Sequence, residues 1–282
     1  MIDLHTHSTF SDGTLTPEEL VAAAEQAGLT AVALTDHDTT AGVERFLAAG
    51  AGRPLRCIAG VELSAEHHPG TLHVLGYFIQ PANAALQDGL DRLRTGRAVR
   101  NREILRRLNE LGLPLTWEEV VAYAGGEVVG RPHFALALIA RGCVVDKEEA
   151  FARYLARGQP GYAERFRLTP AASLQLIRDA GGVPVLAHPH TLDLGRKELR
   201  KLIMELRAQG LEGLEVYYPE HSPAQVRQYR DLAQGLNLVP TGGSDFHGAL
   251  SPYIKLGRGF GTLQVPDEVL AKLEERKPGF GR

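Results

Sequence analysis

Short apolar runs alternate with longer amphipathic patterns towards both ends of the chain. Seven runs rich in aliphatic and β-branched residues, most of them bounded by glycine or proline, predict strands at residues 2–5, 31–35, 55–60, 72–78, 183–187, 213–217 and 238–242. Helix-start signals lie between many of them, as at residues 16–19 and 222–225, where a capping box coincides with proline at the first helical position. This alternation predicts an α/β fold, with a parallel sheet, crossover helices and a closed or nearly closed β/α barrel.

The middle of the chain breaks this alternation. Residues 84–172 contain no strand pattern, whereas residues 86–111 carry leucine and isoleucine at helical spacing, and residues 116–119 form a capping box. We therefore predict a barrel in two parts, residues 1–83 and 173–282. Between them we expect a helical insertion subdomain.

Side chains that bind metals follow most of the predicted strands. His5 and His7 are two residues apart, so both imidazoles point to the same side of an extended strand. The other candidates lie at or near the ends of later runs: Asp12, His37, Glu62, His73, His188, Asp245 and His247. The carboxyl ends of barrel strands converge on one face, so we expect all nine side chains to meet there.

Nine ligands are too many for one ion and fit two or three divalent ions joined by bridging carboxylates. Imidazole and carboxylate donors without thiolates favour manganese, with iron or zinc as alternatives. Each residue alone has another explanation, since Asp12 precedes a glycine and suits a plain turn. Nine independent coincidences explain the pattern less well than one metal cluster. Three other histidines, His67, His68 and His221, are expected to be solvent-exposed.

Composition narrows the class of protein. Apolar residues make up 44% and charged residues 23% of the chain, and the net charge of −3 argues against a protein that coats polyanions. Cys57 and Cys143 stand in apolar surroundings and are predicted to be buried free thiols. We find no signal-peptide pattern and no apolar run of membrane-spanning length, so we expect a cytoplasmic location and no membrane partner. No stable protein partner is inferred.

The predicted long helix is rich in arginine. Between residues 86 and 111 there are seven arginines and four acidic residues. Arginine suits bidentate contact with phosphate, although a solvated basic face is the alternative for any single arginine. A few phosphate contacts in an otherwise acidic protein favour a small phosphorylated substrate or a short RNA end over a long duplex.

Six short motifs surround the candidate ligands: His-Thr-His-Ser at 5–8, Ser-Asp-Gly at 11–13, Thr-Asp-His-Asp at 35–38, Gly-Val-Glu at 60–62, Ala-His-Pro at 187–189 and Gly-Ser-Asp-Phe-His at 243–247. In combination they resemble the polymerase and histidinol phosphatase (PHP) family of metal phosphoesterases. Segments 97–101, 130–133 and 180–183 are similar to the subfamily that includes the 3′,5′-nucleoside bisphosphate phosphatases. One member of that subfamily also acts as a 5′-to-3′ exoribonuclease.

The resemblance implies a distorted barrel of seven strands that holds three divalent ions, typically manganese. It also implies that His133, in the insertion, joins the metal ligands, although the residues alone mark it only as a helix-start residue. Arg97, Arg100, Asn101 and Arg131 become the candidates for substrate binding.

The expected reaction is hydrolysis of a phosphate ester. Divalent ions lower the pKa of bound water towards about 7, and the resulting hydroxide attacks phosphorus in line. We expect Glu62, Asp12 and Asp245 to be the bridging or anchoring carboxylates, and we assign catalytic roles to Glu62, Asp12 and His247.

Three functions stay open at this point. The first is a phosphoesterase for nucleotides, such as 3′,5′-nucleoside bisphosphates, or for short oligoribonucleotides. The second is a phosphatase for another metabolite such as histidinol phosphate, which the helical insertion with its arginines argues against. The third is a non-catalytic metal-binding accessory module, which the complete ligand set argues against.

Overall fold

The computed structural model describes residues 1–124 and 128–279, and it contains one seven-stranded sheet in the order β1-β2-β3-β4-β5-β6-β7. The strands are β1 (Ile2–Asp3), β2 (Ala31–Leu34), β3 (Arg56–Ala65), β4 (Leu72–Tyr77), β5 (Val183–Leu186), β6 (Gly213–Tyr217) and β7 (Val239–Gly242). All seven predicted strands are present. The two edges meet where the Leu4 backbone N–H donates to Gly242 and Thr6 bridges to Phe246, so the sheet is nearly closed into a barrel.

The sheet is mixed, and the prediction of a parallel sheet was wrong for β4. This strand is antiparallel to both β3 and β5, whereas the other neighbouring pairs are parallel. Only residues 66–71 connect β3 to β4, and a parallel pair needs a crossover of about a dozen residues or more. β3 also extends to Ala65 instead of ending at residue 60, so Glu62 lies within a strand and not beyond its end.

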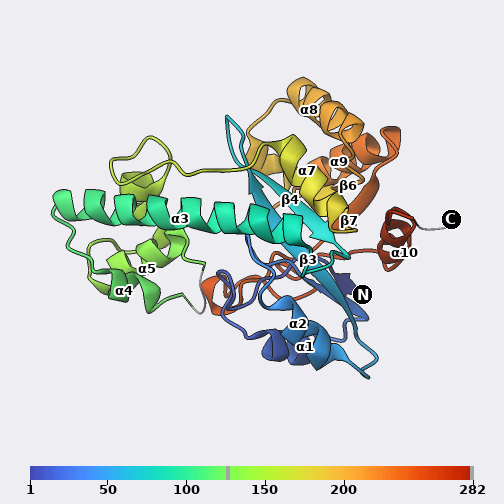
Figure 1. Ribbon diagram of the computed structural model, residues 1–282, viewed down its shortest axis with the longest axis horizontal. Helices are drawn as coiled ribbons and strands as arrows, with labels where there is room; N and C mark the ends of the chain where they lie inside the picture. The colour runs from blue at the N-terminus through green and yellow to red at the C-terminus, as the bar shows by residue number, and fades with distance from the viewer. Residues whose placement is uncertain (125–127, 280–282) are drawn as a thin grey trace.

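Each predicted helix-start signal opens a helix. Complete capping boxes at Thr16 and Ser222 open α1 (Pro17–Gln26) and α9 (Pro223–Gly235). The remaining helices outside the insertion are α2 (Val43–Gly50), α7 (Pro170–Asp179), α8 (Arg196–Ala208) and α10 (Glu268–Glu274), with 3-10 turns at Pro189–Leu192 and Gly248–Leu250. Figure 1 shows α7, α8 and α9 gathered over one side of the sheet, and α1 and α2 over another.

Side chains of the strands face two kinds of core. Leu4, Ala33 and Val185 belong to a buried cluster in the barrel interior, where Leu273 of α10 also packs. Residues such as Val74 face outward and pack with α7, α8 and α9. Figure 1 places α10 beside the start of the chain, near the amino end of β1. The candidate metal ligands lie towards the opposite end, as barrel geometry predicted.

The insertion is built on α3 (Ala84–Glu110), which at 1.5 Å per residue is about 40 Å long. Leu90 in its first half packs into the core beside the sheet, whereas Leu108 in its second half packs with the other insertion helices. Those elements are α4 (Trp117–Val121), α5 (Arg131–Ala140), α6 (Lys147–Ala150) and a π-helical turn at Phe151–Leu155. Figure 1 shows α4 and α5 beside the end of α3 that projects away from the sheet. The boundaries at residues 84 and 172 stay a prediction.

The two cysteines and the apolar character of the helices were also predicted from the sequence. Cys57 and Cys143 are free thiols, but both are half-buried and not fully buried as predicted. Burial raises the pKa of the Cys57 thiol to about 11. Within the described residues, none of the helices combines the length and the apolar character needed to cross a membrane.

Candidate metal centre

The buried carboxylate of Glu62 is surrounded by five imidazoles. Its side chain has no solvent exposure. Its Oε2 lies 2.9 Å from Nδ1 of His37, 3.3 Å from Nε2 of His5 and 3.4 Å from Nε2 of His7, and its Oε1 lies 2.8 Å from Nδ1 of His73 and 3.0 Å from Nε2 of His188. Segments that are far apart in the sequence therefore converge on one carboxylate.

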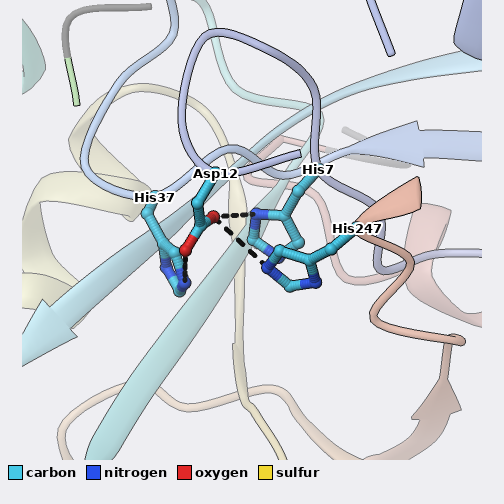
Figure 2. Close-up of side chains that lie close together, drawn as sticks. All are labelled: His7, Asp12, His37 and His247. Carbon is cyan, nitrogen blue, oxygen red and sulfur yellow. Dashed lines mark ion pairs between the residues drawn. The ribbon is translucent and has the colours of Figure 1, made fainter. Parts of the chain in front are cut away.

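Two further carboxylates extend this centre. Oδ1 of Asp245 lies 3.2 Å from Nε2 of His5, 3.0 Å from Nε2 of His7 and 3.6 Å from Nδ1 of His247. Oδ1 of Asp12 lies 3.2 Å from Nε2 of His247 and 3.8 Å from Nδ1 of His7. Figure 2 shows the Asp12 carboxylate between the rings of His7, His37 and His247.

Several candidate metal-ligand atoms lie close together and yet make no hydrogen bond. Among the described residues, Nε2 of His7, Oδ1 of Asp12, Nδ1 of His37 and Oδ1 of Asp245 are buried and have no hydrogen-bond partner. Buried polar atoms in this condition cost free energy unless something else compensates them. Metal–ligand bonds of about 2 Å place neighbouring donors about 3 Å apart around one ion, and most of the spacings above are close to this. The residues therefore fit divalent cations.

Four groups of side chains each bring their ligand atoms within 4.8 Å of one another. The groups are His7–Asp12–His37–His247, His5–His7–Asp245, His5–Glu62–His188 and His37–Glu62–His73. Together they contain all nine side chains selected from the strand ends. Because His5, His7, His37 and Glu62 each belong to two groups, the groups form one continuous cluster.

The carboxylates of this centre stabilise positive charge. Burial alone would lower the pKa of His7, but its interactions with Asp245 and Glu62 outweigh burial and raise that pKa to about 10. Burial likewise opposes ionisation of Glu62, yet the neighbouring His37 and His73 hold its pKa well below the usual value. A divalent cation can supply the positive charge that protonated imidazoles would otherwise supply, and it displaces their protons when it binds.

Residues behind the cluster orient its side chains. Glu215, in β6, places Oε1 2.9 Å from Nδ1 of His5, so that Nε2 of the same ring faces the cluster. Its Oε2 accepts the backbone N–H of His188 at 2.7 Å. The Tyr218 hydroxyl donates to Oδ2 of Asp245 at 2.8 Å, which leaves Oδ1 for the imidazoles. Such outer contacts set the orientation and basicity of metal ligands.

The backbone around the centre is unusually constrained. Asp38, His188 and Asp245 have positive φ angles of 53°, 23° and 54°, which residues other than glycine rarely adopt. Gly243 is needed for a close approach, because a Cβ there would lie 2.4 Å from both the backbone nitrogen and Cβ of His5. Backbone strain of this kind clusters at functional sites, where the surrounding structure holds it.

Three arginines, Arg97, Arg100 and Arg165, form a group next to the centre, which we call the arginine group. Arg97 and Arg165 both donate to Oδ2 of Asp38, the latter at 2.9 Å. Gly130 marks the junction with the centre, because a Cβ at this glycine would lie 3.8 Å from Nη1 of Arg97 and 4.0 Å from Oδ2 of Asp12. The guanidinium of Arg97 and the carboxylate of Asp12 thus both lie beside Gly130.

Arg100 is the least compensated cation of this group. Its side chain is 4% exposed, its Nε donates to Asn101 at 2.9 Å, and within the described residues its Nη2 has no hydrogen-bond partner. Asn101 in turn donates its amide to the Val129 carbonyl at 2.9 Å. Burial lowers the pKa of Arg100, and the like charges of Arg97 and Arg165 lower it further. A bound anion would stabilise this arrangement.

The two remaining candidates come from the insertion. Nδ1 of the buried His133 accepts the backbone N–H of Gly130 at 3.0 Å, while its Nε2 has no hydrogen-bond partner in the described part of the chain. Burial lowers the pKa of His133, which favours the neutral form that binds metals, although it is in none of the four groups. Arg131 donates to the Leu155 carbonyl at 3.1 Å and lies 5.5 Å from the Tyr162 ring, so its contacts are within the insertion.

Sequence reasoning missed several residues of the site. Asp38 directly follows His37 in one motif, so a signal for it was available. Glu215 is a charged residue inside an apolar strand, which also indicates a special role, whereas Arg165 has no local signal. The prediction that His221 is exposed was wrong: its side chain is 7% exposed, and Nδ1 donates to the Val216 carbonyl at 2.9 Å.

Comparison with known proteins agrees with this geometry. Residues 3–175 match the PHP domain family, which covers more than half of the chain. The chain belongs to the PHP domain family. This PHP protein is 36% identical over 247 residues to the 3′,5′-nucleoside bisphosphate phosphatase of Chromobacterium violaceum, an alignment that covers 87% of each chain. It is 37% identical over 258 residues to the 5′-3′ exoribonuclease Rnm of Salmonella typhimurium, covering 91% of this chain and 88% of that protein.

A solved structure supports the fold assignment. The Bifidobacterium adolescentis protein provisionally described as a metal-dependent phosphoesterase superposes with a TM-score of 0.87 and is 31% identical. The match covers 100% of this chain and 98% of that protein. The PHP protein therefore shares the whole architecture, insertion included, with that structure.

Proposed function

We propose that this PHP protein is a metal-dependent phosphoesterase that acts on nucleotides. Its substrates are 3′,5′-nucleoside bisphosphates and short oligoribonucleotides, which it shortens from the 5′ end. The observation that carries the proposal is the convergence of five imidazoles on Glu62, together with the buried and uncompensated Arg100 near Arg97 and Arg165. The names of the Chromobacterium and Salmonella relatives support the same class of substrate.

The proposed ligands of two or three divalent ions are the nine clustered side chains together with His133, whose free Nε2 fits this role. The ions are manganese, because the donors are imidazoles and carboxylates without a thiolate, and iron and zinc are the alternatives. Glu62 anchors the cluster, since five ring nitrogens lie within 3.4 Å of its two oxygens.

When bound, the ions supply an activated water at neutral pH and neutralise the charge on the phosphoryl oxygens. A cavity of about 180 Å³ lies over Asp12, Asp245 and His247 and is the place for the phosphoryl group that is cleaved. Lys147 lines the same cavity and adds a cation from the insertion. Nδ1 of His247 donates to the Asp245 carbonyl at 2.8 Å, which leaves its Nε2, beside Asp12, to hold an ion.

The arginine group provides a second phosphate site. Arg97, Arg100 and Asn101 lie on neighbouring turns of α3, and Arg97 reaches the Asp12 side of the centre. A bisphosphate bound with one phosphate at the metals can thus place its other phosphate against these side chains. Arg131 supports this site through its positive charge, because its own contacts are within the insertion.

A substrate comparison tests the proposal. Phosphate release is measured from 3′-phosphoadenosine-5′-phosphate and from histidinol phosphate, and release of nucleoside 5′-monophosphate is measured from a short 5′-phosphorylated RNA, with manganese present throughout. The proposal predicts that the bisphosphate and the RNA are hydrolysed with much higher kcat/KM than histidinol phosphate. A preference for histidinol phosphate would assign a different substrate, and no hydrolysis of any of the three would favour a non-catalytic module.

A further inference from the structure

A second cavity lies beside the one over Asp12, Asp245 and His247. Its volume is about 390 Å³, within the usual range for ligand pockets of about 300–1,000 Å³. Tyr218 and Pro219 line both cavities, so the larger one, which we call the aromatic pocket, adjoins the proposed position of the cleaved phosphoryl group. Its other lining residues include Tyr217, Arg227, Phe260, Thr262 and Gln264.

The walls of the aromatic pocket suit a flat and uncharged ring. Phe260 is 57% exposed, which leaves its ring available to stack. Tyr218 is fixed by its hydrogen bond to Asp245. Thr262 and Gln264 offer hydrogen-bonding groups. Among the described residues, Arg227 lines the pocket and no carboxylate does. These are the features that bind nucleobases, which stack on aromatic rings and hydrogen-bond at their edges.

The loop that carries Phe260 is held against the rest of the pocket. Gly259 has a φ of 53°, and a Cβ there would lie 2.8 Å from the Pro219 side chain, so glycine permits the close approach. The Lys255 backbone N–H donates to the Gly259 carbonyl at 2.7 Å, and the Gly259 N–H donates back to Lys255 at 2.8 Å. The position of Phe260 is thus built into the fold.

The aromatic pocket and the arginine group lie on different sides of the metal centre. Asp12 lies next to Nδ1 of His7 and Asp245 lies next to Nε2 of the same ring, so the imidazole separates the two carboxylates. Arg97 approaches on the Asp12 side, through Gly130. The aromatic pocket opens on the Asp245 side, past Tyr218.

We propose that the aromatic pocket binds the base of the second nucleotide of a short RNA, which keeps the attacked phosphate when the 3′ oxygen of the first nucleotide leaves. This inference rests on the proposed function. The terminal 5′-phosphate of a short RNA occupies the arginine group and the phosphate to be cleaved occupies the centre. The next nucleotide then continues past Asp245, where its base stacks on Phe260. A nucleoside bisphosphate has no such nucleotide, so it does not use the pocket.

The test uses Phe260→Ala in the metal-loaded enzyme. Tyr253→Ala is the matched control, because Tyr253 is also an exposed aromatic residue, at 80%, but does not line the pocket. Hydrolysis is compared for 3′-phosphoadenosine-5′-phosphate, for a 5′-phosphorylated dinucleotide and for the same dinucleotide without its second base. Binding is measured separately with a dinucleotide that cannot be cleaved, because a methylene group replaces its bridging oxygen. Its second base is 2-aminopurine, and the fluorescence of this base reports binding.

Loss of one base-stacking contact should weaken dinucleotide binding and kcat/KM by about 5- to 150-fold. Phe260→Ala should show this loss only with the intact dinucleotide, and wild-type enzyme should quench 2-aminopurine fluorescence more strongly than Phe260→Ala. Tyr253→Ala should behave as wild type. The inference would be overturned if Phe260→Ala lost kcat/KM equally on the bisphosphate and on the dinucleotide. It would also be overturned if the wild-type enzyme bound the dinucleotide equally well with and without its second base.

Failure of the inference is distinct from failure of the proposed function. If wild-type enzyme hydrolyses the bisphosphate but neither binds nor cleaves the dinucleotide, the aromatic pocket does not bind a second nucleotide, while the phosphatase activity stands. If no phosphate ester is hydrolysed, the proposed function fails. In that case absence of 2-aminopurine quenching by the wild-type protein overturns the inference as well, and quenching that depends on Phe260 supports a base site.

Discussion

Replacement of Arg100 by alanine should separate substrate recognition from catalysis. Arg100 is 4% exposed, and its Nη2 has no hydrogen-bond partner among the described residues, so a phosphate bound there gains a charge-assisted hydrogen bond. Such a bond contributes about 1.5–3 kcal/mol, which corresponds to a loss of about 10- to 150-fold in kcat/KM for a 3′,5′-bisphosphate. Turnover of p-nitrophenyl phosphate should hardly change, because this substrate has no second phosphate.

The same substitution should affect stability only slightly. Arg100 is buried close to the like charges of Arg97 and Arg165, so their mutual repulsion is relieved when it is removed, and this offsets the lost packing of its aliphatic stem. Arg102→Ala is the matched control, because Arg102 is an exposed arginine on the same helix. Its removal should leave kcat/KM unchanged with both substrates. The assay is kcat/KM with both substrates together with thermal unfolding. A loss of equal size with p-nitrophenyl phosphate, or a marked fall in Tm, would show that Arg100 supports the fold or the metals instead.

Glu62→Gln keeps the size of the side chain but removes the negative charge among five imidazoles, so activity should be lost and the metal content should fall. The circular dichroism spectrum should stay unchanged, and turnover near that of wild type would exclude the anchoring role of Glu62. Phe134→Ala removes a ring with no solvent exposure from the insertion core and should lower the free energy of unfolding in urea by about 3–5 kcal/mol. Val99→Ala, at an exposed position of α3, is its control and should have little effect. Alkylation of Cys57 should be slow at pH 8 and rise about tenfold per pH unit up to pH 10, because burial raises its pKa to about 11 and only the thiolate reacts. Labelling that does not depend on pH would contradict this.

The sequence predicted those features that depend on local patterns. Capping boxes at Thr16 and Ser222 open helices where expected, because a cap is made by residues within one turn. The nine candidate ligands converge because strand ends meet on one face of a barrel, so most of them could be selected from a position at or near the end of an apolar run. His73, at the start of β4, reaches the same face because this strand is antiparallel to β3. Composition and spacing were sufficient for this part of the site.

Features that depend on pairing between distant segments were not predictable in the same way. β4 is antiparallel to its neighbours, and this pairing places His73 opposite Ser64, next to Glu62. Nothing local in the sequence specifies that register. Arg165 is another example: it reaches Asp38 only because the segment after the π-helical turn folds back onto the barrel, where Leu168 bridges to Ala65.

The central claim is that the imidazole and carboxylate cluster holds divalent ions that the reaction requires. The most direct measurement is elemental analysis of the purified protein, before and after chelation, with turnover of 3′-phosphoadenosine-5′-phosphate measured on the same samples. We predict two to three divalent ions per chain, loss of turnover in proportion to the metal removed, and recovery when manganese is added back. Full turnover by protein that contains less than one divalent ion per chain would contradict the account.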